Sequence, residues 1–319
     1  MKTILRCFAF AAVLAPLASA AQNYPTRAVR LMVPFPPGGA TDIVGRLVAA
    51  KMQEVWGQPV VIENRPGAGT VVGTDYVAKS APDGHTLGTV VTAYVINPSL
   101  RADLPYNTLK DLAGVTQVSV QHLVMAAHPS LPANSIPELI ALAKKEPGKL
   151  AYATPGSGTA MHLSVELLKT SAGIDLVHIP YKGGAPAQQD VMSGRVPILM
   201  DVLYAVQPLI KSGRIKVLAL LSPQRAPESP EYPVVAEAVP GVSALSLVGI
   251  VAPAATPRDL VNRIGADIAR AVKSSDLTER MRQQGTEPIG STPDQFDALI
   301  RAEIEKWAKV VKQSGAKVD

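Results

Sequence analysis

Short apolar runs alternate with longer amphipathic segments along most of this 319-residue chain. Most of the runs are apolar at every position, which is typical of strands in a parallel sheet covered on both faces. The segments between them carry apolar residues at helical spacing. This β-α-β-α order predicts a doubly wound α/β architecture, in which ligands bind at the carboxyl ends of the strands. The runs are residues 29–33, 60–62, 87–91, 123–127, 150–153, 176–179, 196–200, 217–221 and 247–252.

The length of the chain and its composition allow two domains. Hydrophobic residues make up 47% and charged residues 18%, as in globular proteins. No long Pro/Ser/Gly linker divides the chain, so we expect two domains joined by strand-like crossings near residues 122–126 and 244–250. Domain I would then comprise residues 21–123 and 247–319, and domain II residues 124–246.

Helix-start residues precede several of the amphipathic segments. One apolar stripe covers residues 43–55, and either Thr41 or Asp42 is its expected N-cap. Ser135 and Pro137 stand at cap and first-turn positions of a second helix. Further helices are expected over residues 163–169, from Pro257 to about Ser274, and from Thr292-Pro293 onward.

The first 20 residues have the features of a secretory signal peptide. Lys2 and Arg6 form a basic region, residues 7–17 are apolar, and Ala18-Ser19-Ala20 is a small-residue cleavage site. Cys7 is the single cysteine and lies inside this segment rather than at its end, which disfavours lipid anchoring. We therefore predict an exported, periplasmic protein cleaved after about Ala20, without disulfides or cysteine-bound metal.

The charge of the chain argues against nucleic acid as a partner. The formal net charge is +5, and Lys2 and Arg6 contribute two of these charges. No Lys/Arg cluster with interleaved aromatic residues occurs in the remaining sequence.

The stretch from Val33 to Asp42, Val-Pro-Phe-Pro-Pro-Gly-Gly-Ala-Thr-Asp, joins the first apolar run to the first helix. Its prolines exclude a strand or helix interior, and its two glycines let the backbone approach another molecule closely. Free N–H groups and the helix dipole would converge there and suit a carboxylate or phosphate. The alternative is a loop that only turns the chain. The predicted ligand contacts are Phe35, Pro36, Gly38, Gly39, Ala40, Thr41 and Asp42.

A second glycine-rich turn has the same place relative to its strand and helix. Residues 150–153 lead into Thr154-Pro155-Gly156-Ser157-Gly158-Thr159, and a helical segment starts at Ala160. The hydroxyl groups add donors beside the free N–H groups of a helix start. Two such loops facing each other could hold a carboxylate without any arginine. The predicted contacts here are Gly156, Ser157, Gly158 and Thr159.

Three further strand ends supply candidates for the distal part of a ligand. Thr92, Ala93 and Tyr94 end one apolar run, and Tyr94 could offer an aromatic wall with a hydroxyl group. Asp201 closes another run, where it either caps the following turn or contacts ligand. The third end is the turn Gly183, Gly184 and Ala185, preceded by Lys182, which could supply a cation or simply be solvated.

Enzymatic chemistry has little support in the sequence. The five histidines, at 85, 122, 128, 162 and 178, form no metal-binding motif, so no metal or other cofactor is predicted. Ser157 lies in Gly-Ser-Gly rather than in a G-x-S-x-G motif. His162 is too near Ser157 in sequence to be assigned as its catalytic base from the sequence alone.

The chain resembles the substrate-binding receptors of tripartite tricarboxylate transporters, the Bug family, over essentially its whole mature length. The matching stretches are Tyr24-Pro25-Thr26-Arg27, Val33 through Asp42, Val61-Ile62-Glu63-Asn64-Arg65-Pro66-Gly67-Ala68-Gly69-Thr70, Pro82-Asp83-Gly84-His85-Thr86, Ile96-Asn97-Pro98-Ser99-Leu100, Tyr181-Lys182-Gly183-Gly184-Ala185-Pro186-Ala187, Pro233-Val234-Val235-Ala236-Glu237-Ala238 and residues 247–257.

This resemblance implies a two-domain periplasmic binding protein fold, with a ligand cleft between two mainly parallel sheets flanked by helices. It further implies that loops matching residues 36–42 and 154–159 grip a carboxylate through main-chain groups and bridging waters. Many family members have a tryptophan where this chain has Leu247 and Val248. The resemblance therefore does not predict an aromatic side chain lining the cleft at that point.

Together these observations predict a monomeric periplasmic receptor that captures a small mono- or dicarboxylate and delivers it to membrane transporter subunits. One alternative is a periplasmic enzyme that acts on a carboxylate with Ser157, His162 or Asp201. Another is a sensory receptor that presents its ligand to a membrane kinase. The sequence does not separate transport from sensing.

Overall fold

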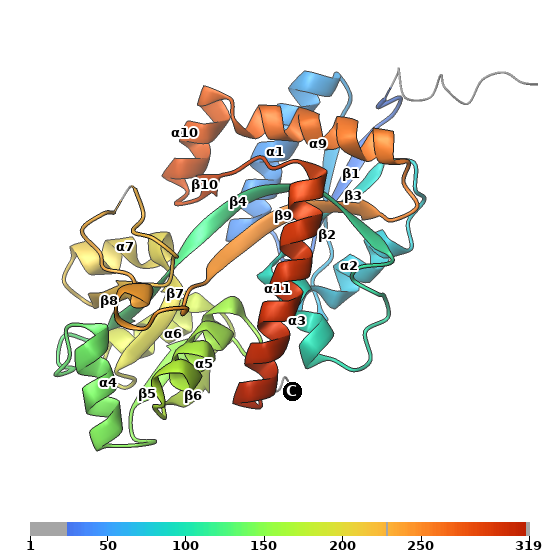
Figure 1. Cartoon of the computed structure of the whole chain (residues 1–319). Coiled ribbons are helices and arrows are strands. Elements are labelled where there is room, and N and C mark those ends of the chain that lie inside the picture. The colour runs from blue at the N-terminus through green and yellow to red at the C-terminus, as the bar shows by residue number, and fades with distance from the viewer. Residues whose placement is uncertain (1–23, 228, 317–319) are drawn as a thin grey trace, which may run out of the picture.

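The computed structural model describes residues 24–227 and 229–316. It is a mixed α/β protein built on one curled sheet with the strand order β2-β1-β3-β9-β4-β7-β5-β6, and β10 and β8 also pair with β4 (Figure 1). The predicted signal peptide lies outside the described residues. The strands are β1 (Val29–Val33), β2 (Val60–Asn64), β3 (Thr86–Val91), β4 (Leu112–Ala127), β5 (Ala151–Thr154), β6 (Val177–Pro180), β7 (Ile198–Val202), β8 (Lys216–Leu220), β9 (Leu245–Pro253) and β10 (Glu287–Pro288).

The sheet has two parallel parts linked by antiparallel strands. In the first part, β1 pairs in parallel with β2 and β3. In the second part, β5 pairs in parallel with β6 and β7. The long strands β9 and β4 run antiparallel to their neighbours between the two parts. The predicted apolar runs are thus confirmed as strands, and parallel pairing is confirmed on either side of this central pair.

Strand β4 belongs to both parts of the sheet. Its residues 112–122 pair with β9, whereas residues 123–127 pair with β7 and β8. Figure 1 shows β4 and β9 side by side between an upper and a lower group of helices. Strand β4 changes its partners at Leu123, and the division of the chain into two domains stays a prediction.

The helices cover both faces of the sheet. Helices α1 and α9 pack against each other, and α10 packs against both of them. The segment predicted to run from Pro257 to about Ser274 forms α9, and α10 follows it separately. The helices are α1 (Ala40–Trp56), α2 (Val71–Ala78), α3 (Thr92–Leu100), α4 (Ile136–Lys145), α5 (Ala160–Ala172), α6 (Gly184–Met192), α7 (Leu203–Lys211), α8 (Val235–Ala238), α9 (Arg258–Val272), α10 (Ser275–Gln283) and α11 (Pro293–Ser314), with a short 3-10 turn over Ala68–Thr70.

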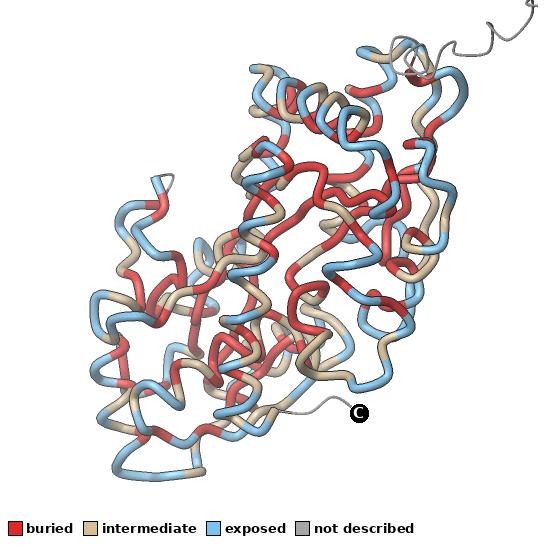
Figure 2. The backbone as a smooth tube through the Cα atoms, turned by 45° about the vertical axis from the view of Figure 1, so that its right-hand side comes forward, coloured by how far each residue is buried: buried red, intermediate tan, exposed pale blue. Residues whose placement is uncertain are grey.

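The last helix, α11, runs from the upper part of the fold to the lower part (Figure 1). It begins with a capping box, in which Thr292 and Gln295 exchange side-chain to backbone hydrogen bonds. Phe296 and Trp307 on its apolar face are fully buried, as the stripe in the sequence predicts. The helix packs against α3 and β4 and also against α5, so it contacts both parts of the fold. Figure 2 shows that buried residues follow the central strands and the inner faces of these helices.

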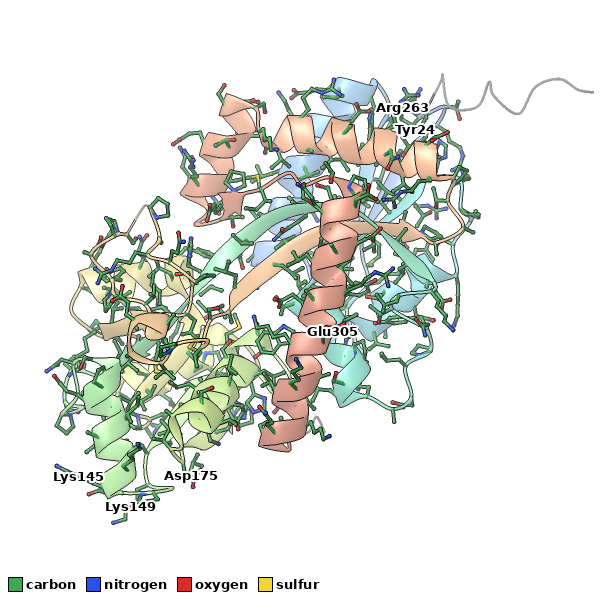
Figure 3. The ribbon with its side chains drawn as sticks, in the orientation of Figure 1. Tyr24, Lys145, Lys149, Asp175, Arg263 and Glu305 are labelled. Atoms are coloured by element: carbon green, nitrogen blue, oxygen red, sulfur yellow. The ribbon has the colours of Figure 1, made fainter. Side chains whose placement is uncertain are left out.

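The start of the described chain is attached to the first part of the fold. The hydroxyl group of Tyr24 donates to the carbonyl oxygen of Gly84 at 2.7 Å. Arg263 on α9 donates to the carbonyl oxygen of Tyr24 at 2.8 Å, and Figure 3 shows these two residues beside each other. Among the described residues, no helix combines the length and the apolar character needed to cross a membrane.

Candidate ligand-binding site

The loop between β1 and α1, residues 35–42, is called loop 1 here. The residue at its tip, Gly38, has φ +87°, a left-handed conformation that favours glycine. Gly39 is the N-cap of α1, so the helix begins at Ala40. The expected N-cap, Thr41 or Asp42, is therefore wrong by two or three residues. Asp42 lies in the first turn instead, where its carboxylate reaches back and accepts from the N–H of Gly38 at 2.9 Å.

The carboxylate of Asp42 is fully engaged within the protein. Oδ2 also accepts from Nε of Arg46 at 2.8 Å, and Oδ1 accepts from the side-chain amide of Asn64 at 2.9 Å. The same amide nitrogen of Asn64 donates to the carbonyl oxygen of Phe35 at 2.9 Å. Burial opposes ionisation of Asp42, but the hydrogen bonds from Arg46, Asn64 and Gly38 outweigh it and lower the pKa of the carboxyl group. The buried Asp42 side chain thus stabilises the shape of loop 1.

Loop 1 leaves several donors unused. Within the described part of the chain, the N–H groups of Gly39, Ala40, Thr41 and Asp42 make no hydrogen bond, and neither does the Thr41 hydroxyl group. Residues 36–39 are exposed, and Ala40 and Thr41 are partly exposed. These N–H groups stand at the positive end of the α1 dipole, so they can receive an anion.

The loop between β5 and α5, residues 154–159, is called loop 2. Gly158 has φ +72°, and Thr159 is the N-cap of α5. The Thr159 hydroxyl group accepts from the N–H of His162 at 3.2 Å and donates to the carbonyl oxygen of Gly156 at 2.8 Å. The N–H of Gly158 donates to Nδ1 of His162 at 3.1 Å. The helix start predicted at Ala160 is confirmed.

A stack of three rings supports loop 2 from inside the protein. The imidazoles of His162 and His178 lie parallel, with centroids 3.9 Å apart, and the ring of Tyr152 stacks on His178 with centroids 4.9 Å apart. Nε2 of His178 is 2.7 Å from the hydroxyl oxygen of Thr154, at the start of the loop. Burial lowers the pKa of His162 to about 4, and burial together with the neighbouring His162 does the same for His178.

Loop 2 also offers unused donors. Within residues 24–227 and 229–316, the hydroxyl group of Ser157 and the N–H groups of Ser157, Ala160 and Met161 make no hydrogen bond. Ser157 and Met161 are partly exposed. Of the predicted contact residues of loop 2, Ser157 thus keeps free donors beside a helix N-terminus, whereas the N–H groups of Gly156 and Gly158 are used within the protein.

The turn from β6 to α6 lies directly against loop 2. The N–H of Gly183 donates to the carbonyl oxygen of Pro155 at 2.9 Å, and Gly183 is the N-cap of α6. This helix begins at Gly184. The structure thus brings Gly183, Gly184 and the exposed Ala185 together with loop 2.

Asp201 is buried at the end of β7, beside the α6 start. Its carboxylate accepts from the side-chain amide of Gln188 at 2.9 Å and from the N–H of Val202 at 2.8 Å. A Cβ atom at Gly184 would lie 2.9 Å from Oδ2 of Asp201, so only glycine fits there without displacement. Burial raises the pKa of Asp201 against the effect of these two hydrogen bonds. Because Val202 is the N-cap of α7, the contact with its N–H fits a role at the following turn.

The predicted contacts at the end of β3 have mostly buried side chains. The hydroxyl oxygen of Thr92 accepts from the N–H of Leu247 at 3.0 Å and ties α3 to β9. Tyr94 is 1% exposed, and its hydroxyl group donates to the carbonyl oxygen of Thr108. Ala93 is partly exposed. Leu247 and Val248 are also buried.

Four supporting residues were not recognised from the sequence as parts of a site. Asn64 and Arg46 hold loop 1. His178 contacts loop 2, and Gln188 donates to Asp201. One signal was available for Arg46, because it follows Asp42 by one helical turn and can pair with it. The others depend on contacts between elements distant in the chain.

A separate cavity opens between α7 and α10. Its volume is about 450 Å³, and neither loop 1 nor loop 2 lines it. Its lining residues include His122, Tyr204, Gln207, Ser229, Glu279 and Gln283. In the described ranges, no group of three or more His, Cys, Asp or Glu side chains could hold a metal ion.

Two parallel parts of a sheet joined by long antiparallel strands, with a loop suited to an anion at strand ends in each part, define the class of two-domain periplasmic solute-binding proteins. A model for the "tripartite tricarboxylate transporter family receptor" matches residues 44–316 of the chain. The chain belongs to this family, which confirms the resemblance seen in the sequence.

Curated relatives and solved structures agree with this assignment. Protein BugT of Bordetella pertussis is 38% identical over 313 residues, covering 97% of this chain and 95% of BugT. The structure of R. palustris Rpa4515 with adipate is 36% identical, has a TM-score of 0.82, and is matched over 92% of this chain and 100% of that chain. MatC from Rhodopseudomonas palustris with bound malate is 31% identical, has a TM-score of 0.77, and is matched over 90% of this chain and 100% of its own.

Proposed function

We propose that this protein captures a small organic mono- or dicarboxylate between loops 1 and 2 and delivers it to a tripartite tricarboxylate-type membrane transporter. The observation that carries the proposal is the repeated geometry of the two loops. Each places unused N–H groups of a helix start at the carboxyl end of a parallel strand, one in each part of the fold.

The chemistry of the loops favours an anion. A helix N-terminus contributes about 0.3–1 kcal/mol to holding a negative charge, and more when partly buried. The acidic side chain in loop 1, Asp42, is neutralised by Arg46, so it does not repel a carboxylate. Adipate and malate, named for two solved relatives, belong to the proposed class.

Capture would couple to closure of the two parts of the fold. A ligand favours the closed state only to the extent that it contacts both loops. We assign the free donors of residues 39–42 in loop 1 and of Ser157, Ala160 and Met161 at loop 2 to the carboxylate. Ala93, Gly183, Gly184, Ala185 and Asp201 are assigned to the distal end of the ligand. We further propose that the protein is exported by its signal peptide, is cleaved after about Ala20 and is monomeric.

Thermal-shift screening of the mature protein tests this function. Ligand at 100 times its dissociation constant adds about 2.7 kcal/mol of stability, which raises the unfolding midpoint measurably. We expect a shift with aliphatic or aromatic carboxylates, including adipate and malate. Shifts with sugars or cationic amino acids, and none with any acid, would contradict the proposal.

The enzymatic alternative has a specific geometric obstacle. Nδ1 of His162 already accepts from the N–H of Gly158, and Ser157 makes no hydrogen bond to His162 in the described structure. A general base must reach the proton that it removes. Incubation of the bound acid with purified protein, followed by mass spectrometry, should recover it unchanged, whereas a converted acid would support an enzyme. The genes beside this one would separate transport from sensing.

A further inference from the structure

Loops 1 and 2 share one local structure despite different sequences. In both, a glycine with positive φ precedes the helix N-cap: Gly38 at +87° and Gly158 at +72°. The N-caps also agree, with φ −77° and ψ 165° at Gly39 and φ −78° and ψ 163° at Thr159. Residues 38–42 therefore correspond in register to residues 158–162.

The same hydrogen bond closes both loops. The N–H of the left-handed glycine donates to the side chain of the residue four positions later, at 2.9 Å to Asp42 and at 3.1 Å to His162. This bond turns the glycine N–H inward. Within the described residues, the N–H groups of residues 39–42 stay free at loop 1 and those of residues 159–161 stay free at loop 2, where the N–H of His162 instead donates to the Thr159 hydroxyl group.

The two acceptors differ in charge, because Asp42 is a carboxylate and His162 is an imidazole. The residue one helical turn further on is basic after Asp42 and acidic after His162. Asp42 is followed by Arg46, which neutralises the carboxylate at 2.8 Å. His162 is followed by Glu166, whose Oε1 lies 4.0 Å from Nε2 of the imidazole. An N–H donor on Gly158 requires an unprotonated Nδ1, so the imidazole carries its proton on Nε2, on the side of Glu166.

From this correspondence we infer that His162 is a positioning residue for ligand capture, supplying an uncharged acceptor to loop 2 where loop 1 uses a neutralised carboxylate. The inference rests on the proposed function, because it assumes that the free N–H groups of loop 2 receive a carboxylate. His162 does not touch the ligand. It fixes Gly158 and thereby the direction of the donors that do.

The surroundings of His162 favour a neutral acceptor over a charged one. His178 covers one face of the ring at 3.9 Å. Glu166 is already bound by the hydroxyl group of Tyr152 at 2.7 Å and by Lys169 at 2.9 Å. A carboxylate at position 162 would face Glu166 with no arginine of its own, and it would add a negative charge beneath the site that receives the anion.

Three substitutions at position 162 separate the effect of having an acceptor from the effect of its charge. In His162→Asn, the side-chain oxygen lies two bonds from Cβ, as Nδ1 does, and remains a neutral acceptor. His162→Asp keeps an acceptor but adds charge, and His162→Leu removes the acceptor. His128→Asn is the matched control, because the His128 side chain is only partly buried and its hydrogen bonds are local ones to Ser130.

Calorimetric titration with adipate and with malate gives the affinity readout. We expect His162→Asn to recover most of the wild-type affinity, whereas His162→Leu and His162→Asp bind about tenfold more weakly or worse. His128→Asn should bind as the wild type does. Wild-type affinity in His162→Leu, or equal losses in His162→Asn and His162→Leu, would overturn the inference.

A ligand-free measurement keeps the test decisive if neither acid binds. In protein labelled with ¹⁵N-glycine, which reports on the 24 glycines of the chain, the Gly158 amide should be protected from hydrogen exchange in the wild type and in His162→Asn. It should exchange at least about tenfold faster in His162→Leu. Failure of the wild type to bind any carboxylate contradicts the proposed function, whereas unchanged exchange of Gly158 in His162→Leu contradicts the positioning role.

Discussion

The side-chain amide nitrogen of Asn64 lies 2.9 Å from Oδ1 of Asp42, and it is also 2.9 Å from the carbonyl oxygen of Phe35. One residue at the end of β2 thus fastens loop 1 at both of its ends. Arg46 adds a weaker contact to the Asn64 side-chain oxygen at 3.4 Å. Loop 1 therefore has a fixed shape before any ligand arrives, which lowers the entropy lost on binding.

Replacing Asn64 by alanine should loosen loop 1. The substitution leaves two partly buried acceptors without this donor, so we expect a loss of about 1–3 kcal/mol in the free energy of unfolding. The affinity for adipate or malate should fall as well. Urea unfolding and calorimetry measure these effects. Asn262→Ala is the control, since Asn262 is exposed on α9. Equal behaviour of the two variants would argue against the fastening role.

Replacing Asp42 by asparagine tests the charge of loop 1. The new amide group would turn a donor toward the N–H of Gly38, Arg46 or Asn64, and we expect a destabilisation of about 1–3 kcal/mol. The lowered pKa of Asp42 gives a second signature. Its contribution to stability is present above the unfolded pKa of about 3.9 and is lost as the pH falls through the folded value. The wild type but not Asp42→Asn should show this loss below pH ~4.

The stacked histidines should make the protein less stable in mild acid. The pKa of His162 is about 4 in the folded state, against about 6.5 unfolded. The unfolded state therefore binds the proton first, so stability is complete above pH ~6.5 and declines as the pH falls toward 4. For His162 alone the decline is on the order of 3 kcal/mol. Urea midpoints between pH 7 and 4 measure it. His162→Asn should flatten the curve, and an unchanged slope in that variant would refute the assignment.

Adding a methyl group at Gly184 should affect the distal end of the ligand site. The Cβ atom would stand 2.9 Å from Oδ2 of Asp201 and 3.3 Å from the amide nitrogen of Gln188. One of these side chains must move, and we expect a destabilisation of about 1–3 kcal/mol. If Asp201 contacts the far end of the ligand, Gly184→Ala should weaken binding of adipate more than binding of a short monocarboxylate. An equal change for both acids would instead place Asp201 outside the ligand site.

The sequence predicted the strands better than the supports of the site. Continuous apolar runs mark strands regardless of their neighbours, and the runs from residues 29–33 to 247–252 all became strands. The chain direction of each pairing is not encoded in such runs, so the antiparallel placement of β9 and β4 could not be read from them. Asp is favoured both at N-caps and in the first helical turn, which explains the error at the start of α1.

The two loops were found because glycine, proline and hydroxyl residues between a strand and a helix have a local meaning. Their supports come from elsewhere: Asn64 lies 22 positions after Asp42, and His178 lies 24 positions after Thr154. No local pattern pairs such residues. Tyr94 shows the opposite case, because its place after a strand predicted exposure at a site, whereas α3 turns the ring into the core.

The contacts of helix α11 would allow a relative motion of the two parts of the fold to be measured. It packs on α3 and β4 near one part of the fold and on α5 near the other, and α5 carries loop 2 at its first residue. Any rotation of the two parts must slide α5 along α11 or separate them. A fluorophore pair placed on the exposed faces of these two helices would therefore convert ligand occupancy into an optical signal, with no label near the ligand itself.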